Sequence, residues 1–339
     1  MSIKNDRINL IGKISFRKGI NYLKLRTSFL YSRFSKKNIH QGLPVSISIE
    51  PTTACNLGCP ECPSGLKKFS RPTGNLKQEM NKKIIDELER HLLYINFYFQ
   101  GEPYINPDFL DMVRYASQKK IYTSTSTNAH FLNEENARRT VESGLDRLII
   151  SIDGTTQETY SAYRVHGKLE KVLEGTRNII RFKKELKSKT PHVIFQFLVV
   201  KPNEHQIEDV LQMAKKLEVD EVRLKTAQVY DYENGNPLIP TNEKYARYKK
   251  LANGKFVLKN RMEDHCWRMW SSCVITWDGA VVPCCFDKDA SYKLGKMEEK
   301  PFAEIWKSEE YNQFRKNVLT DRKSIDICSN CSEGTKVWA

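Results

Sequence analysis

Hydrophobic runs and amphipathic stretches alternate between residues 45 and 226. Six short apolar or β-branched runs predict strands, at Val45–Ile49, Tyr94–Phe99, Ile121–Thr125, Arg147–Ile152, Val193–Val200 and Glu221–Lys225. The intervals between them carry apolar residues at helical spacing, as at Met80, Ile84, Ile85, Leu88 and Leu92. Repeated strand–helix units predict a parallel sheet covered by helices, in either a doubly wound sheet or a β/α barrel.

Polar motifs follow four of these strands at their carboxyl ends. A cysteine-rich loop follows the first strand, Gly101-Glu102-Pro103 the second, Thr127-Asn128 the third and Asp153-Gly154 the fourth. A β/α barrel gathers its active-site groups at this edge of its strands. The placement therefore favours a full or partial barrel over a doubly wound sheet.

The cysteine-rich loop, CNLGCPECP, contains Cys55, Cys59 and Cys62. A cubane iron–sulfur cluster needs four ligands, so three thiolates leave one iron open. The sequence shows neither a secretory signal pattern nor an apolar run long enough to span a bilayer, which predicts a cytoplasmic protein. Thiols stay reduced there, so clustered cysteines are expected to bind metal rather than to form disulfides.

A second cysteine group lies beyond a linker at residues 234–240. A helix is predicted near Lys244–Leu251, a hairpin around Asp278-Gly279, and a further helix at Pro301–Val318. The group combines a C-x2-C pair with four more distant cysteines, and its members are Cys266, Cys273, Cys284, Cys285, Cys328 and Cys331. Such an arrangement is typical of a metal site.

These motifs, in this order, resemble the radical S-adenosylmethionine (SAM) superfamily over about residues 45–226. The resemblance implies a partial (β/α)6 barrel in an α/β chain. It implies that Cys55, Cys59 and Cys62 bind a [4Fe-4S] cluster whose open iron is chelated by the amino and carboxylate groups of SAM. In this family an external donor such as flavodoxin or ferredoxin supplies the electron that cleaves SAM to a 5′-deoxyadenosyl radical.

The resemblance also implies SAM contacts at matching positions. Glu102, in the counterpart of the family's Gly-Gly-Glu-Pro motif, would hold the methionine amino group, and Arg164 the carboxylate. The matching residues are Gln100, Gly101, Glu102, Asn128, Ser151, Asp153 and Arg164, of which Asn128, Ser151 and Asp153 match positions near the ribose. Two positions depart from the family: Gln100 replaces a glycine, and Glu61 replaces an aromatic residue that often contacts the adenine. Taken alone, each motif would be read as a turn, a helix cap or a surface charge.

The spacing of the second cysteine group resembles the twitch subdomain, a shortened relative of the SPASM domain that holds one auxiliary [4Fe-4S] cluster. The implied ligands are Cys266, Cys284, Cys328 and Cys331, with Cys273 as an alternative to Cys266. Cys285 then remains a spare cysteine. Four thiolates also suit tetrahedral zinc, which is the alternative for this site.

Four segments follow from these patterns: a basic amphipathic extension at 1–44, a radical SAM core at 45–226, a linker and helix at 227–262, and a small α+β iron–sulfur domain at 263–339. The resemblance implies abstraction of hydrogen from a substrate C–H bond. An auxiliary cluster favours a dehydrogenase-like two-electron oxidation of a small molecule. The alternatives are a peptide- or protein-modifying maturase, and a non-catalytic zinc-binding protein with a nucleic-acid or other acidic partner.

Charge concentrates at the amino-terminal end of the chain. Residues 1–44 contain ten Lys or Arg and one acid, Asp6, which gives +9 of the net +14. Apolar residues alternate with these charges as in a helix with one apolar side. We expect the extension to pack on the main domain, and the alternatives are contact with an anionic membrane surface or an acidic partner; nucleic acid is less favoured.

Overall fold

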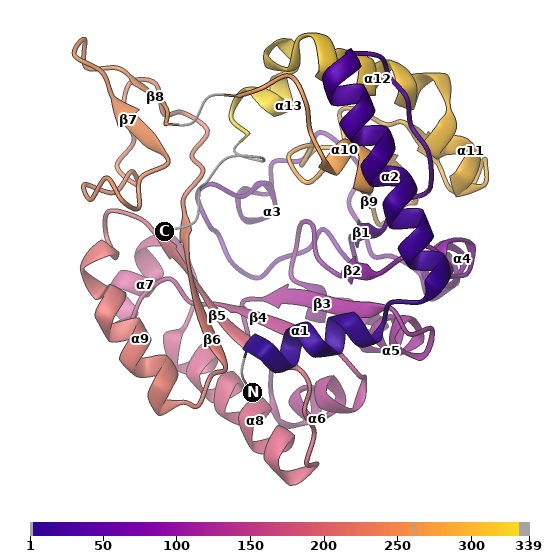
Figure 1. Cartoon of the computed structure of the whole chain (residues 1–339). Coiled ribbons are helices and arrows are strands. Elements are labelled where there is room, and N and C mark those ends of the chain that lie inside the picture. The colour runs from indigo at the N-terminus through magenta and orange to yellow at the C-terminus, as the bar shows by residue number, and fades with distance from the viewer. Residues whose placement is uncertain (1–2, 260–261, 332–339) are drawn as a thin grey trace.

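Among residues 3–259 and 262–331, which the computed structural model describes, nine strands form one sheet (Figure 1). Its central part is parallel and follows chain order: β1 (Ser46–Ile49), β2 (Tyr94–Asn96), β3 (Tyr122–Thr127), β4 (Arg147–Ser151), β5 (His192–Val199) and β6 (Glu221–Thr226). All six predicted strands are confirmed. A doubly wound sheet reverses its strand order at a switch point. The strand order here has no such reversal, so the sheet is that of a partial barrel and not a doubly wound sheet.

The register of these strands separates an apolar outer face from a polar inner one. Ile47 pairs with Ile95, and both are buried, whereas the neighbouring pair Ser48 and Asn96 is partly exposed. At the other end of the sheet Gln196 pairs with Arg223 on the polar face. Helices cover the apolar face only: α4 (Gln78–Leu88), α5 (Phe109–Gln118), α6 (Glu134–Glu142), α7 (Gln157–Tyr163), α8 (Leu169–Glu185) and α9 (Ile207–Lys216). The polar side chains therefore line the inside of the barrel.

The C-terminal segment extends the same sheet instead of forming a separate one. β9 (Ser272–Ile275) pairs in parallel with β1, and β10 (Ala280–Val282) and β11 (Gly295–Lys296) continue the sheet in antiparallel pairing. The predicted hairpin is β9–β10. The predicted helix at Pro301–Val318 is two helices, α11 (Phe302–Lys307) and α12 (Glu309–Thr320), because Ser308 between them has extended backbone and caps α12 through its hydroxyl. α10 (Arg268–Ser271) and α13 (Asp326–Ser329) complete this part.

The helix predicted near Lys244–Leu251 is wrong. Tyr248–Lys250 forms β7, which pairs in antiparallel fashion with β8 (Phe256–Leu258). The turn between them contains Asn253-Gly254, and Gly254 has a φ of +83°, a conformation that favours glycine. Tyr248 stacks on Tyr232 with ring centroids 4.4 Å apart, so tertiary packing outweighs the local helical pattern.

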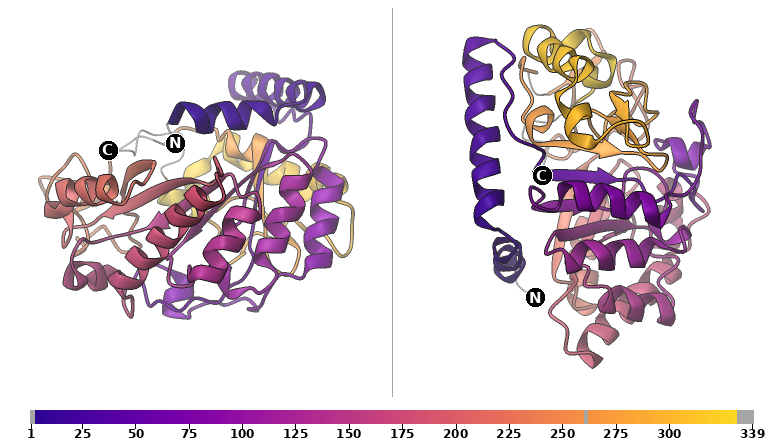
Figure 2. Two further views of the ribbon diagram at one scale, coloured as in Figure 1. Left: turned by 90° about the horizontal axis from the view of Figure 1, so that it is seen from below. Right: turned by 90° about the vertical axis from the view of Figure 1, so that its right-hand side faces the viewer.

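The basic extension forms two helices, α1 (Ile3–Gly12) and α2 (Phe16–Ser35), which lie together on one side of the molecule (Figure 2). Asp6 is buried and accepts hydrogen bonds from Tyr122 and Arg147, the first residues of β3 and β4. α2 packs Phe29 against Trp267 and Trp270. The extension thus covers the amino ends of the strands, opposite the cysteine-rich loop. None of the helices in the described residues is long and apolar enough to cross a membrane.

Candidate functional site

The cysteine-rich loop leaves the carboxyl end of β1 and ends where α3 (Pro63–Leu66) begins after Cys62. The loop is joined to the end of β2 by backbone contacts. Gly101 donates its N–H to the Ser64 hydroxyl at 2.8 Å, and Glu102 donates its N–H to the Ala54 carbonyl at 2.8 Å. Gly101 has a φ of +74°, and a Cβ there would lie 2.4 Å from the Thr52 carbonyl oxygen. Only glycine fits at this crossing.

Each of the three cysteine sulfurs is contacted by a side chain from a different part of the barrel rim. The Asn128 amide nitrogen lies 4.0 Å from Cys55 Sγ, and an Arg164 guanidinium nitrogen lies 3.7 Å from Cys59 Sγ. Gln100 Oε1 lies 3.8 Å from Cys62 Sγ. The structure therefore brings Gln100, Asn128 and Arg164 together around the loop, although they are far apart in the sequence.

Burial changes the acidity of this cysteine group. It raises the pKa of the Cys55 thiol to about 12, and it also raises the pKa of Cys59, against the opposing effect of the Arg164 guanidinium. Neither thiol forms a disulfide. Buried thiols with high pKa values become thiolates when a metal replaces their protons. The donor set of three cysteines in one loop thus fits a three-thiolate iron–sulfur cluster.

Glu102 lies buried behind the loop, with both carboxylate oxygens hydrogen-bonded. One oxygen accepts from the Thr127 hydroxyl and the other from the Asn128 backbone N–H, each at 2.7 Å. Burial is the main cause that raises its pKa from 4.5 to about 7. A cationic ligand nearby would stabilise the carboxylate, which suits the role that we predicted for Glu102.

Asp153 is fully buried and fixes Arg164. One of its carboxylate oxygens accepts from Arg164 Nε, and the other accepts from the Leu198 backbone N–H at 2.7 Å. Ser151 lies on the inner face of β4, with its hydroxyl 3.5 Å from that of Ser126. The structure thus gives Asp153 a positioning role, and the ribose contacts of Asp153 and Ser151 stay predictions.

Two residues near the loop, Tyr230 and Lys288, were not identified from the sequence. Glu61 accepts the backbone N–H of Tyr230 at 2.9 Å and thereby holds this aromatic residue beside the loop. Tyr230 in turn accepts from Lys288 Nζ at 2.8 Å. Burial lowers the pKa of Lys288, against the opposing effects of Cys62, Cys285 and Glu61. Lys288 thus lies within electrostatic range of both cysteine groups. No sequence signal connects these segments, which are about 170 and 60 residues apart.

The second cysteine group assembles around Arg322. An Arg322 guanidinium nitrogen lies 3.3 Å from Cys331 Sγ, and Cys266 and Cys328 are also within its electrostatic range. Burial raises the pKa of the Cys284 thiol, and nearby Cys285, Cys266 and Cys331 raise it further. All four predicted ligands, Cys266, Cys284, Cys328 and Cys331, are thus electrostatic neighbours of Arg322 or of one another.

Cys273 is buried within β9, in the same apolar cluster as Cys266 and Cys328. It pairs with Ile47 in the register of β9 on β1, is 2% exposed, and has Arg315 as its charged neighbour. Cys266, unlike Cys273, is an electrostatic neighbour of both Arg322 and Cys284, which favours Cys266 as the fourth ligand. In the described part of the chain, no three His, Cys, Asp or Glu side chains are gathered closely enough for a single metal ion. The choice between an iron–sulfur cluster and zinc for this cysteine group therefore depends on the family to which the chain belongs.

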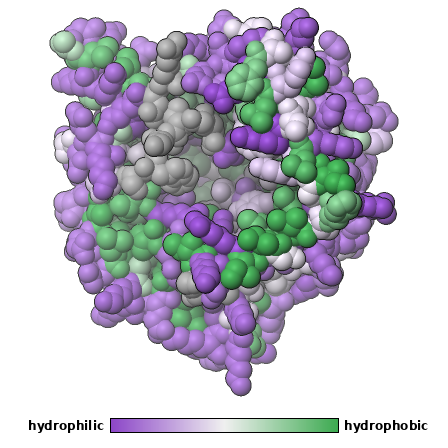
Figure 3. Space-filling model, viewed as in Figure 1, coloured by the Kyte–Doolittle hydropathy of each residue, from purple (hydrophilic) through white to green (hydrophobic). Residues whose placement is uncertain are grey.

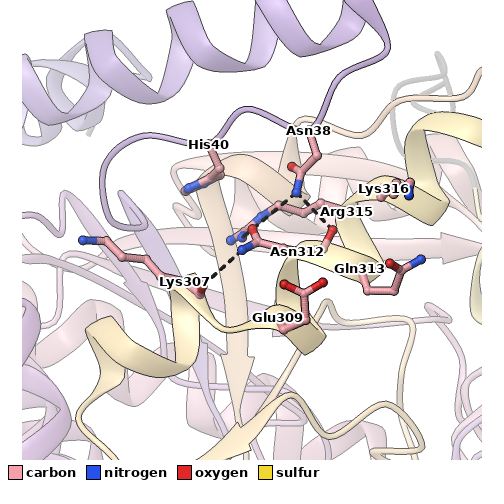
Figure 4. Close-up of a pocket in the computed structure, with 8 residues that line it drawn as sticks. All are labelled: Asn38, His40, Lys307, Glu309, Asn312, Gln313, Arg315 and Lys316. Atoms are coloured by element: carbon pink, nitrogen blue, oxygen red, sulfur yellow. Dashed lines mark hydrogen bonds between the residues drawn. The ribbon is translucent and has the colours of Figure 1, made fainter.

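Two pockets differ in their relation to these residues. A cavity of about 530 Å³ opens beside Cys55 and is lined by the loop and by residues 64–75. Another, of about 460 Å³, lies between the segment that follows α2 and α12 (Figure 4). Arg315 in this second pocket donates to the Met269 and Trp306 carbonyls. None of the predicted ligands lines the second pocket, and its polar groups serve packing.

Two family models match the chain. The Radical SAM superfamily model matches residues 49–217, and the SPASM model, an iron–sulfur cluster-binding domain, matches residues 266–332. Together they span well over half of the chain. The chain is 27% identical over 315 residues to the tungsten-containing aldehyde ferredoxin oxidoreductase cofactor-modifying protein of Pyrococcus furiosus, covering 84% of this chain and 86% of the relative. It is 27% identical to the mycofactocin maturase MftC of Mycobacterium ulcerans, covering 85% of this chain and 80% of that one.

Solved structures share the fold. The structure of BtrN in complex with AdoMet and 2-DOIA superposes with a TM-score of 0.53 at 18% identity, covering 88% of this chain and 97% of that one. Streptococcus suis SuiB bound to the precursor peptide SuiA superposes with a TM-score of 0.63 at 13% identity, covering 88% and 72%. At these identities the likeness concerns the fold alone.

The family settles the cofactors that the sequence predicted. A radical SAM domain uses SAM and a [4Fe-4S] cluster, and a SPASM domain binds auxiliary iron–sulfur clusters. The alternative of a non-catalytic zinc-binding protein has no support from these matches. The two models cover both cysteine groups. The chain belongs to the radical SAM superfamily and carries a SPASM iron–sulfur domain.

Proposed function

We propose that this enzyme abstracts hydrogen from a C–H bond of a polar substrate and oxidises it by two electrons, in the maturation of a peptide or of a cofactor precursor. The observation that carries the proposal is the contact of Asn128, Arg164 and Gln100 with the three sulfurs of one loop. Cys55, Cys59 and Cys62 would hold a cluster that binds SAM, and this pair would supply radical chemistry when an external donor such as flavodoxin or ferredoxin reduces the cluster.

The protein's own contribution is to hold SAM beside the loop. Arg164, fixed by Asp153, would offer its guanidinium to the methionine carboxylate, and Glu102 would offer its carboxylate to the amino group. Because Gly101 has no side chain, the backbone after β2 can approach the loop closely and place Glu102 beside it. Because Glu61 holds Tyr230 beside the loop, Tyr230 is the ring that we expect to contact the adenine in place of the missing aromatic residue.

The inner face of the barrel supports a polar substrate. Ser48, Asn96, Ser126, Gln196 and Arg223 line it and are partly exposed, whereas the outer face is apolar. Hydroxyls, amides and a guanidinium suit the polar groups of a peptide or a modified sugar better than they suit a lipid chain. The two relatives that match most of the chain are named as a cofactor-modifying protein and a maturase, which favours a maturation substrate.

The second cysteine group supports the oxidation. Four cysteine ligands would leave no open iron on an auxiliary cluster, which suits electron transfer rather than substrate chelation. A two-electron oxidation would remove one hydrogen atom, one electron and one proton from the substrate, and an auxiliary cluster held by the second cysteine group would accept the electron. Lys288, which donates to the Tyr230 hydroxyl, is within electrostatic range of Cys62 and Cys285 and so is a neighbour of both cysteine groups.

The first test is SAM cleavage in oxygen-free conditions. Cys59→Ala removes one of three ligands, so we expect reductant-dependent formation of 5′-deoxyadenosine to fall below detection. Cys273→Ala is the matched control: this cysteine is buried on the outer face, and its variant should cleave SAM at the wild-type rate. Unchanged cleavage in Cys59→Ala would contradict the assignment of the loop.

A further inference from the structure

Exposed apolar side chains concentrate on the two N-terminal helices. Of 16 large apolar side chains that are exposed in the described residues, 11 lie between residues 3 and 39. The five most exposed are all there: Phe16 (84%), Phe34 (80%), Leu23 (62%), Ile11 (62%) and Ile8 (56%). Soluble proteins scatter such side chains singly, and gathered ones mark an interaction surface.

On α2 these side chains form one stripe at helical spacing. Phe16, Ile20, Leu23, Tyr31 and Phe34 follow one another at intervals of four, three, eight and three residues, which keeps them on one side of the helix. The opposite side is buried against the protein through Asn21, Leu25, Ser28, Phe29 and Ser32. The fold therefore buries one side of this helix and leaves the apolar stripe on the other side exposed.

Basic residues border the stripe on both sides. Helical geometry places Arg17 and Lys24 along one border and Arg26 and Arg33 along the other. Arg17 and Lys24, together with Arg90, lie within electrostatic range of His91, whose pKa is lowered first by burial and then by these cations. The only acid among residues 1–44 is Asp6, which is buried in its bonds to Tyr122 and Arg147. The exposed side of the extension is thus apolar and basic.

The two helices present these residues on one face of the molecule. Figure 2 shows α1 and α2 one after the other, at an angle, along one side of the molecule, and Figure 3, which views that side, shows apolar side chains there. On α1, Ile8 and Ile11 point away from Asp6 by helical spacing and are exposed. This face covers the amino ends of the strands, so the cysteine-rich loop at their carboxyl ends faces elsewhere.

We propose that α1 and α2 bind the surface of an anionic lipid bilayer, with Phe16, Leu23 and Phe34 inserted among the headgroups and the flanking Arg and Lys side chains on the lipid phosphates. A helix with an apolar stripe between cationic borders is the form that lies in a membrane interface. A second copy of this chain is a poor occupant, because it would place like charges against one another. The enzyme would thereby act on a substrate made or delivered at the membrane.

Vesicle flotation of the full-length, cluster-loaded enzyme tests this. With phosphatidylcholine vesicles containing about one third phosphatidylglycerol, we expect binding that weakens on added salt; with phosphatidylcholine alone we expect little. The triple variant Phe16→Ser, Leu23→Ser, Phe34→Ser should bind the anionic vesicles about ten-fold more weakly or worse. The control Leu186→Ser, Leu211→Ser, at exposed sites outside the N-terminal helices, should bind like the wild type.

Formation of 5′-deoxyadenosine by every variant serves as the check of folding, since the stripe lies away from the cysteine-rich loop. Three outcomes would overturn the proposal: no binding to anionic vesicles at low salt, equal binding by the triple variant, or an equal loss in the control. Capture of an acidic protein by this face without binding to vesicles would also refute it.

Discussion

At the scale of single residues, the structure replaces a missing family feature with a contact that is distant in sequence. Glu61 occupies the position of an aromatic residue, but its carboxylate accepts hydrogen bonds from the Tyr230 backbone and the Asn236 side chain. Lys288 Nζ lies over the Tyr230 ring, 4.6 Å from the ring centroid. An aromatic residue is therefore held beside the loop from a distant position in the chain, as the proposed adenine contact of Tyr230 would need.

This arrangement predicts the effect of replacing Tyr230. Tyr230→Ala removes the ring beside the loop, so we expect the KM for SAM to rise about ten-fold, a loss within the range of one aromatic contact. Tyr230→Phe keeps the ring and loses only the hydroxyl that Lys288 contacts, so its KM should stay near the wild-type value. Initial rates of 5′-deoxyadenosine formation at varied SAM measure both. An equal rise in the two variants would assign the effect to the hydroxyl and not to the ring.

At the scale of elements, α1 is fixed to the barrel by one buried acid. Asp6 accepts from Tyr122 and Arg147 at the start of β3 and β4, while Asn9 donates to Asp146 at 2.7 Å. A buried charge pair specifies position more than it adds stability, because both groups lose their water. Asp6 therefore explains how a helix with few buried side chains keeps one place on the strand ends.

Removal of Asp6 should destabilise this end of the barrel. Asp6→Ala leaves the Arg147 guanidinium without its carboxylate, and we expect a loss of about 2–4 kcal/mol in the free energy of unfolding. The control Asp111→Ala breaks a half-exposed pair with Arg114 and should cost at most about 1 kcal/mol. Urea unfolding measures both, and amide hydrogen exchange in α1 should rise only in Asp6→Ala. Equal losses in the two variants would show that the pair does not anchor α1.

At the scale of the whole molecule, one continuous sheet joins the two cysteine groups. β9 pairs with β1, and Ser70, beyond the cysteine-rich loop, donates its backbone N–H to Asp289 in the second half of the chain at 3.0 Å. Lys288 next to it reaches Tyr230. The auxiliary domain is therefore built into the barrel rather than tethered to it, as electron transfer between the barrel interior and a second cluster requires.

The iron content should separate the two cysteine groups. The wild type should hold about eight irons per chain, four for each of two cubanes. Cys331→Ala should lose about four of them and yet still cleave SAM, because the loop at β1 is intact. Cys273→Ala should keep about eight. Iron and sulfide analysis with Mössbauer spectra of anaerobically reconstituted protein measures this, and a loss of iron in Cys273→Ala alone would restore Cys273 as the ligand.

The sequence by itself determined the six barrel strands, the cysteine-rich loop and the presence of a second cysteine group, since local periodicity and spacing record them directly, whereas its four ligands stay a prediction from resemblance. It failed at β7, where packing of Tyr248 on Tyr232 outweighs a helical pattern, and it left Cys273 open as a ligand. Only the tertiary structure placed Cys273 on the outer face, brought Tyr230 to Glu61 and left the apolar stripe of α2 exposed. Each of these depends on contacts between segments far apart in the chain, whose partners no local pattern specifies.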